Sequence, residues 1–166
     1  MVTVAIAAII AMIAAPSFQQ MTRRSRLATA SNEFVAAMQT ARVSAVSQRQ
    51  AVSVCPSADG ATCAAAAGTR WIVLTNTNAV LKDFTLPRDI TAQGSPNLRG
   101  ANFRVIFGPS GFSKAGTGAA APTTATLAVC GSGIDGENAT DITVAMGRVS
   151  TIRRSATSAC ADPAER

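Results

Sequence analysis

The sequence predicts an α+β protein in which one long N-terminal helix packs on a small antiparallel β-sheet domain. Three observations predict it. Between Val2 and Ala15 every residue except Thr3 is apolar. Beyond this run, apolar residues recur at spacings of three, four and seven, which is the period of a helix with one buried face. After Gln50 the pattern changes to short β-rich runs separated by Gly, Pro, Asn and Asp.

The apolar run admits two interpretations. It is shorter than the about 20 apolar residues that a bilayer span needs, so it is either a signal peptide or part of a longer apolar helix. A signal peptide carries basic residues before its apolar run, whereas here three arginines follow it. The helical period then continues without a break, which favours one retained helix. The residues that mark this period are Leu27, Phe34, Met38, Ala41 and Ala45.

We therefore divide the chain into three parts. A membrane-embedded helix half occupies residues 1–28, an amphipathic helix half occupies residues 29–50, and a β-domain occupies residues 51–166. Pro16 lies inside the first part. Because its ring removes a backbone hydrogen bond, we expect Pro16 to kink the helix.

Short β-rich runs fill the β-domain and predict a mostly antiparallel sheet structure packed on the amphipathic helix half. We assign the aperiodic segments Pro87–Gly100 and Ser113–Pro122 to loops. The aromatic side chains of Trp71, Phe103 and Phe107 are expected in the core. The predicted strands are Ala51–Cys55, Arg70–Thr75, Val80–Leu86, Asn102–Phe107, Thr124–Cys130, Asp141–Met146 and Val149–Arg153.

Four cysteines, at positions 55, 63, 130 and 160, contain no CxxC pair, and the chain has no histidine to complete a zinc site. An even number of cysteines in a small domain behind an apolar helix indicates two disulfides in an oxidising compartment. Three pairings are possible. We favour Cys55 with Cys63, which closes a short loop, and Cys130 with Cys160, which ties down the C-terminal tail.

The composition argues against an enzyme. The absence of histidine and tyrosine removes common acid, base and metal-ligating groups. The glycine-rich segment Gly131–Gly136 spells GxGxxG, but a strand follows it rather than a helix, so we interpret it as a hairpin loop. We expect no catalytic residues, no metal, no cofactor and no small-molecule substrate. The net charge of +6 suits a polyanionic partner, or serves only solubility.

Several segments carry a family resemblance. The run Met1–Ile10, continuing into Ala15–Phe18, resembles the N-terminal helix of type IV pilins and type II secretion pseudopilins. The segments Asn32–Ala37, Val105–Gly111 and Gly147–Arg148 resemble the GspH/FimT branch in particular. The resemblance implies a pilin-like fold, with two small sheets against the C-terminal half of the helix. It also implies anchorage in the bacterial inner membrane, a periplasmic domain, and assembly with other pilins through the N-terminal helix.

In that family a peptidase cleaves just before a short apolar stretch that carries a glutamate. Neither the cleavage motif nor the glutamate occurs before the apolar run in this sequence. The missing length matches the shortfall of the apolar run, so we expect the natural chain to begin upstream of Met1.

A C-terminal group of basic residues is the candidate binding site. Gly147 suits a tight hairpin turn that lifts Arg148 to its tip, and Arg153 and Arg154 end the last strand. One guanidinium group can bind two oxygens of a phosphate at once, so these arginines suit a phosphate-binding patch. The alternative is that they form only a solvated face of the domain. FimT-like minor pilins are associated with DNA uptake through a Gly-Arg-x-Arg motif. Gly147 and Arg148 match its first two positions, but Ser150 stands where the motif has its second arginine. The predicted DNA-binding residues are Arg148, Arg153, Arg154 and Lys114.

The predicted function is that of a minor pilin or pseudopilin subunit for the assembly of a type IV pilus or a type II secretion pseudopilus. Binding of double-stranded DNA without sequence preference, through the C-terminal arginines, is the further role that we expect. One alternative is a type II secretion pseudopilin that binds no DNA. A distant alternative is a secreted enzyme. The sequence leaves all three open.

Overall fold

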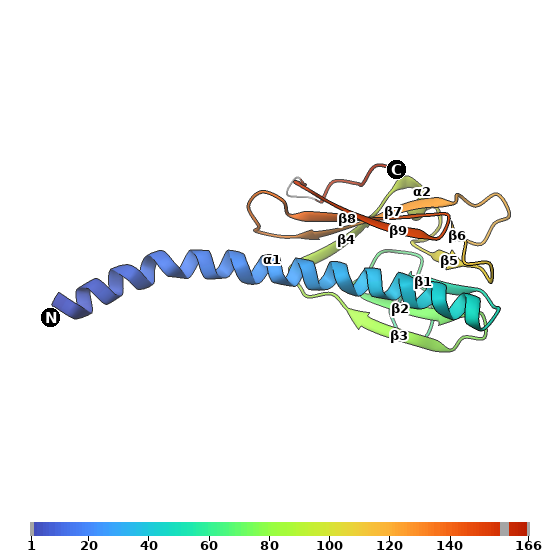
Figure 1. The fold of residues 1–166 in the computed structure, drawn as a ribbon, viewed down its shortest axis with the longest axis horizontal. Coiled ribbons are helices and arrows are strands. Elements are labelled where there is room, and N and C mark those ends of the chain that lie inside the picture. Colours follow the sequence, from blue (N-terminus) through green and yellow to red (C-terminus); the bar gives the residue numbers. More distant parts are fainter. Residues whose placement is uncertain (1, 157–159, 166) are drawn as a thin grey trace.

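A single helix dominates the fold. The computed structural model describes residues 2–156 and 160–165, with residues 2–17 described by their backbone. Helix α1 (Val2–Ser47) runs along the domain and projects well beyond it, and its N-terminal part bends away from the axis of the rest (Figure 1). Whether Pro16 causes that bend stays a prediction. Within the described residues no helix combines the length and the apolar character that crossing a membrane requires. The membrane-embedded half at residues 1–28 therefore also stays a prediction.

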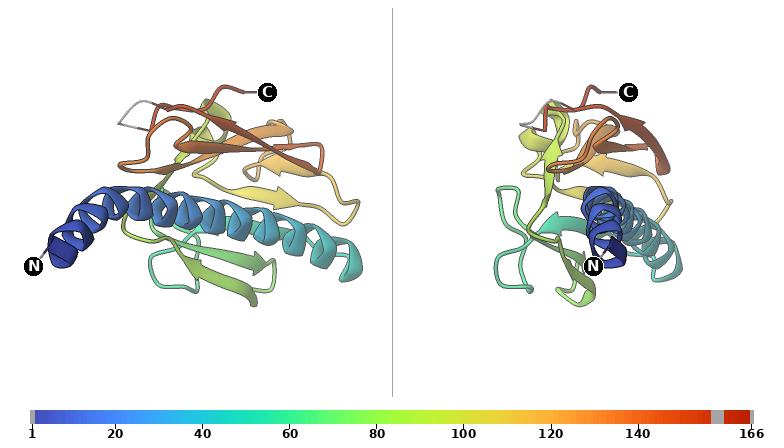
Figure 2. Two further views of the ribbon diagram at one scale, coloured as in Figure 1. Left: turned by 60° about the vertical axis from the view of Figure 1, so that its left-hand side comes forward. Right: turned by 90° about the vertical axis from the view of Figure 1, so that its left-hand side faces the viewer.

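Two antiparallel sheets pack against the C-terminal part of α1, which lies in the angle between them (Figure 2). The five-stranded sheet has the order β3-β2-β1-β5-β6, and the four-stranded sheet has the order β4-β7-β8-β9. This arrangement confirms the predicted α+β, pilin-like fold class. The five-stranded sheet consists of β1 (Val52–Pro56), β2 (Arg70–Thr75), β3 (Val80–Thr85), β5 (Val105–Phe107) and β6 (Ser113–Ala115). The four-stranded sheet consists of β4 (Ile90–Gly94), β7 (Thr124–Gly131), β8 (Ala139–Ala145) and β9 (Arg148–Arg154).

The core lies where the buried face of α1 meets both sheets. Phe34 is fully buried and packs edge-on against the rings of Trp71, at 4.9 Å between centroids, and Phe84, at 5.1 Å. Trp71, Phe103 and Phe107 are buried, as predicted from the sequence. The small side chains on the helix let both sheets approach it closely. The buried face of α1 comprises Leu27, Ala30, Ser31, Phe34, Ala37, Met38, Ala41 and Ala45.

The assignment of two segments to loops was wrong. Strand β4 and the short helix α2 (Pro96–Gly100) lie within Pro87–Gly100, and β6 lies within Ser113–Pro122. Strand β4 forms an edge of its sheet by pairing with β7, and β6 adds three residues beside β5. These strands are short and contain Gly, Gln, Lys or Ser, so their pairing is decided by neighbouring strands rather than by their own pattern.

Candidate functional site

A tight turn joins β8 and β9 at Gly147, as expected from the sequence, but its tip is formed by Met146 and Gly147 rather than by Arg148. Met146 and Gly147 have φ angles of 50° and 87°, and Ala145 pairs with Arg148 across the turn. Two successive positive φ angles are typical of a type I′ turn, whose twist suits a two-residue hairpin. Arg148 is exposed and begins β9 directly after the turn.

Strand β9 separates the three predicted arginines rather than gathering them. Val149 packs against the core, so alternate residues Thr151 and Arg153 share its face toward α1. Arg148 and Arg154 belong to the opposite, outer face. Arg148 and Arg153 also lie five residues apart on one strand, which corresponds to about 16 Å.

Arg154 is engaged in an ion pair with the neighbouring strand. Its Nε donates to Asp141 Oδ1 at 2.8 Å and to Oδ2 at 2.9 Å, and the Asp141 side chain is 2 % exposed. Its second guanidinium nitrogen donates to the carbonyl oxygen of Ala161, at 2.7 Å. Arg154 therefore joins β8, β9 and the C-terminal tail, which leaves it less available to a ligand.

Lys114 lies in the other sheet, on β6, where it pairs with Ile106. Its ammonium group donates to the carbonyl oxygen of Gly118 at 3.3 Å. No carboxylate of the described residues lies within ion-pair distance of Lys114, Arg148 or Arg153. The four predicted residues thus occupy separate places on two sheets.

A groove of about 560 Å³ runs between α1 and the four-stranded sheet, and Arg153 lines it. Arg24 from α1 lines the same groove, together with Asp135 and Glu137 from the β7–β8 loop. The groove therefore carries charges of both signs. The sequence interpretation missed the proximity of Arg24 to Arg153, because these residues lie far apart in the chain.

The GxGxxG segment begins at Gly131, the last residue of β7, and continues into the β7–β8 loop, which contacts the helix at the point where α1 leaves the domain. Arg23 donates to the carbonyl oxygen of Gly133 at 2.9 Å, and Arg24 donates to that of Asp135 at 3.1 Å. Gln20 donates to the Asp135 carboxylate at 3.0 Å. Gly133 has a φ of 63°, and a side chain there would collide with the Arg23 guanidinium. The glycine-rich loop is thus a contact for the helix.

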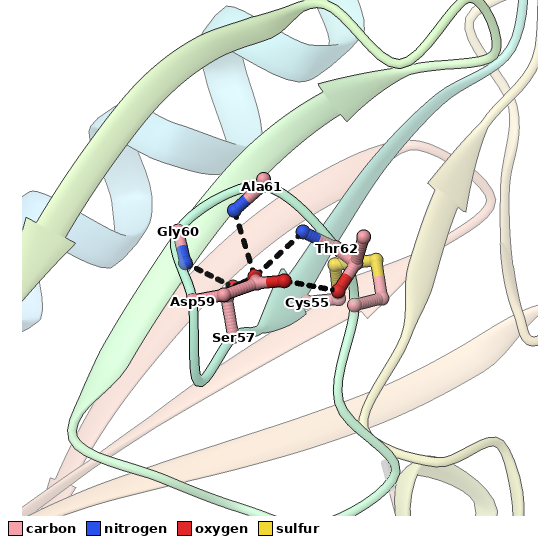
Figure 3. Close-up of a disulfide and its surroundings, with 7 residues drawn as sticks. Cys55, Ser57, Asp59, Gly60, Ala61 and Thr62 are labelled. Carbon is pink, nitrogen blue, oxygen red and sulfur yellow. Dashed lines mark hydrogen bonds between the residues drawn. A yellow bond between two sulfur atoms is a disulfide. The ribbon is translucent and has the colours of Figure 1, made fainter.

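Both disulfides join the pairs favoured from the sequence. Cys55 is bonded to Cys63 and Cys130 to Cys160, with Cα–Cα distances of 5.5 and 5.8 Å. The first bond closes a loop on the five-stranded sheet, and the second ties the tail to β7. The loop Pro56–Cys63 is ordered around one carboxylate, that of Asp59 (Figure 3).

Asp59 accepts backbone hydrogen bonds from Ala61 and Thr62, both at 2.8 Å, and a third from the Thr62 hydroxyl at 2.7 Å. Ser57 adds a hydroxyl donor at 3.0 Å. The backbone donors of Thr62 and Ala61, followed by the hydroxyls, hold the pKa of Asp59 well below its ordinary value. Its acceptor positions serve the loop itself, which makes this a structural carboxylate.

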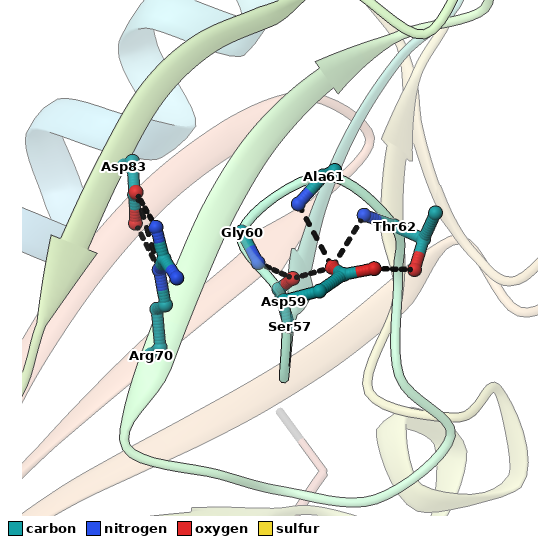
Figure 4. A network of polar contacts seen from close by, with 7 residues as sticks. All are labelled: Ser57, Asp59, Gly60, Ala61, Thr62, Arg70 and Asp83. Carbon is teal, nitrogen blue, oxygen red and sulfur yellow. Dashed lines mark hydrogen bonds and ion pairs between the residues drawn. The ribbon is translucent and has the colours of Figure 1, made fainter.

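Beside the loop, Arg70 pairs with Asp83 across strands β2 and β3 (Figure 4). The Arg70 Nε lies 3.0 Å from Asp83 Oδ1 and 3.2 Å from Oδ2. These hydrogen bonds lower the pKa of Asp83 and raise that of Arg70. The guanidinium also covers Gly60, where a side chain would collide with it. Among the described residues no three His, Cys, Asp or Glu side chains come together as metal ligands.

Comparison with known proteins places this geometry in context. Residues 30–148 match the family model described as "Type II transport protein GspH". Two crystal structures of the type IV minor pilin FimU from Pseudomonas aeruginosa PAO1 share the fold, each with 23 % sequence identity. The first has a TM-score of 0.56 and covers 80 % of this chain and 92 % of FimU. The second has a TM-score of 0.53, with coverages of 75 % and 90 %. No curated protein sequence matches significantly.

Proposed function

The chain belongs to the GspH/FimT family of minor pilins and pseudopilins, and from that premise we propose that it enters its filament through the projecting part of α1. The course of α1 supports this proposal, because the helix extends beyond the domain at its N-terminal end while one face of its C-terminal part is buried against the two sheets. Phe18 and Met21, where the helix leaves the domain, are each 72 % exposed. Large exposed apolar side chains on a helix favour packing against another apolar surface.

The proposal extends to location. The first part of α1 rests in the inner membrane before assembly, and the disulfide-bonded domain lies in the periplasm. Two disulfides fit an oxidising compartment. We infer a structural subunit rather than an enzyme, an inference that the absence of histidine, the commonest general base near neutral pH, supports.

Replacing Met21 by glutamate tests the packing role. We expect the Met21→Glu chain to reach the membrane but to be lost from the sheared filament fraction, because a carboxylate then faces an apolar contact. Ile152→Glu is the matched control: Ile152 is 45 % exposed on β9, away from α1. Incorporation of the Met21→Glu chain at the level of Ile152→Glu would contradict the proposal.

DNA binding is the second candidate function, and exposed cations support it. Arg148 and Arg153 are exposed and lack a carboxylate within ion-pair distance among the described residues, and the whole chain carries a net charge of +6. We include Lys114 as a third phosphate contact. Arg154 contributes less, because Asp141 and Ala161 already occupy two of its nitrogens. Dispersed contacts of this kind favour sequence-independent binding of duplex DNA through its phosphates.

Fluorescence anisotropy with a labelled duplex, at several salt concentrations, tests this candidate on the full chain in detergent micelles. Arg148→Ala, Arg153→Ala and Lys114→Ala are each expected to reduce the slope of log affinity against log salt by about one. Arg154→Ala is expected to change it least. A wild-type chain that shows no binding at low salt favours the alternative of a type II secretion pseudopilin that binds no DNA.

A further inference from the structure

The end of the molecule opposite the N-terminus gathers three chain segments. The last turns of α1, the β5–β6 turn and the β8–β9 turn all lie there (Figures 1 and 2). Two glycines fix the contacts. A side chain at Gly111 would meet Val46 at 3.3 Å and Arg42 at 3.6 Å, while a side chain at Gly147 would collide with the Gly111 carbonyl oxygen. Each turn therefore packs directly on the next.

Hydrogen bonds link the segments at this end and close the β5–β6 turn. The Gly147 amide donates to the Ser113 hydroxyl at 2.7 Å in a buried contact. Two backbone hydrogen bonds close the β5–β6 turn, both at 2.9 Å. The Gly108 amide donates to the Phe112 carbonyl oxygen, and the Gly111 amide donates to the Gly108 carbonyl oxygen. Phe112 is thus displayed by an ordered turn rather than by a loose loop.

The side chains displayed here are large, apolar and exposed. Val43 and Met146 are each 65 % exposed, Phe112 is 62 % exposed and Val46 is 49 % exposed. Arg42 and Arg148 flank them, and neither has a carboxylate within ion-pair distance among the described residues. None of the three segments contains an acidic residue. We name Arg42, Val43, Val46, Phe112, Met146 and Arg148 the distal patch.

We propose that the distal patch is a docking surface for another protein subunit, whose contact surface is an apolar hollow ringed by carboxylates. Phe, Met and Arg are the residues enriched in the cores of protein interfaces, and an exposed apolar cluster of this kind marks an interaction site. Arg42 and Arg148 require negative charge on the partner.

The charges argue against a second copy of this chain as the partner. Both charged residues of the patch, Arg42 and Arg148, are cationic, so two distal patches facing each other place like charges together. Duplex DNA is disfavoured as the occupant of the whole patch, because a phosphate contact by Arg148 alone leaves the exposed Val43, Val46, Phe112 and Met146 without an apolar partner. A different, acidic protein surface satisfies both the apolar and the cationic groups. The inference rests on the proposed role as a filament subunit, since such a subunit meets unlike neighbours.

The test uses the full chain in detergent micelles and each of the other pilin-like subunits of the same cell, purified in the same way. Affinities are measured by thermophoresis. We expect one subunit to bind the wild-type chain, and the double variant Phe112→Ala/Met146→Ala to bind it at least tenfold more weakly. Arg148→Glu is expected to weaken binding at low salt more than at high salt. Ile152→Ala, an exposed residue near the other end of β9, is expected to stay within twofold of wild type.

Several results would overturn the inference. They are binding to none of these subunits, equal binding by the double variant, or self-association of the wild-type chain that the double variant abolishes. A loss of duplex DNA affinity in the double variant, with subunit binding unchanged, also counts against it. Failure of the proposed function gives a different result from failure of this inference. If the proposed function is wrong, the wild-type chain is missing from sheared filaments, whatever the distal patch binds. Because Phe112 and Met146 are exposed, the double variant is expected to keep its thermal stability.

Discussion

Arg154 on β9 holds the carboxylate of Asp141, a buried acid on β8, through one nitrogen that lies 2.8 and 2.9 Å from its two oxygens. The sequence alone predicts a ligand-binding role for this arginine. In the fold its first role is to neutralise a buried charge, since burial of a carboxylate without a partner is strongly unfavourable.

Arg154→Ala is therefore expected to destabilise the domain. The pair is open to solvent on the arginine side, whose side chain is 21 % exposed, so we expect a loss of about 2–3 kcal/mol in the free energy of unfolding. Chemical denaturation of the full chain in detergent micelles measures it. Arg153→Ala serves as the control and is expected to stay within about 0.5 kcal/mol of wild type. Equal stabilities for the two variants would contradict this role.

The two disulfides are expected to contribute unequally. Cys130–Cys160 closes a span of 30 residues and Cys55–Cys63 a span of 8. The loop-entropy relation gives about 3.5 kcal/mol for the first and about 2.5 kcal/mol for the second. Thermal unfolding of Cys130→Ser/Cys160→Ser and Cys55→Ser/Cys63→Ser chains checks the order. A greater loss on removal of the shorter bridge would show that the hydrogen-bonded Asp59 loop outweighs loop length.

The stability of the domain is expected to depend on pH through Asp59. Its pKa lies below the ordinary value of 3.8 in the folded chain, so its stabilising effect is complete at higher pH. That effect declines as the pH falls below about 4 toward the depressed folded pKa, because Asp59 is protonated first in the unfolded chain and folding must then release that proton. Unfolding temperatures measured from pH 7 to pH 2 for wild type and Asp59→Asn check this. The difference between them should shrink in acid, and a difference that is constant with pH would exclude the carboxylate as its source.

Gly147→Ala is expected to destabilise the domain by more than about 1 kcal/mol, for two reasons. Its φ of 87° disfavours a side chain, and the added methyl group would overlap the carbonyl oxygen of Gly111. Gly136→Ala separates these causes, since Gly136 has a φ of 79° but no atom within 4 Å of the added carbon. Denaturation curves should show the larger loss for Gly147→Ala. Equal losses would mean that backbone conformation alone matters there.

Phe34→Ala is expected to cost about 3–5 kcal/mol, because the ring is fully buried and packs on both Trp71 and Phe84. Phe34→Leu keeps most of the side-chain volume, so it is expected to lose less of the free energy of unfolding than Phe34→Ala. The near-ultraviolet circular dichroism of Trp71 reports the same contact, since the indole loses its edge-on neighbour. An unchanged tryptophan signal in Phe34→Ala would show that α1 does not pack as described.

Local signals made several elements predictable. The helical period of Leu27, Phe34 and Met38 indicated the face of α1 that is buried, and the glycine at position 147 indicated the tight β8–β9 turn, where its φ is 87°. The cysteine count indicated two bonds, and chain proximity favoured the pairing that the structure shows. Each of these features depends on residues close together in the chain, where periodicity and backbone preference act directly.

By itself, then, the sequence determined the long helix, most of the strands, the hairpin turn and the disulfide framework. Only the tertiary structure decided that Arg153 faces α1 while Arg154 faces Asp141, and that Val46, Phe112 and Met146 meet at one end of the molecule. It also decided that β4 and β6 are strands. The physical reason is that a side chain's partner depends on which strand or turn lies beside it. That neighbour is chosen by packing of the whole chain rather than by local pattern.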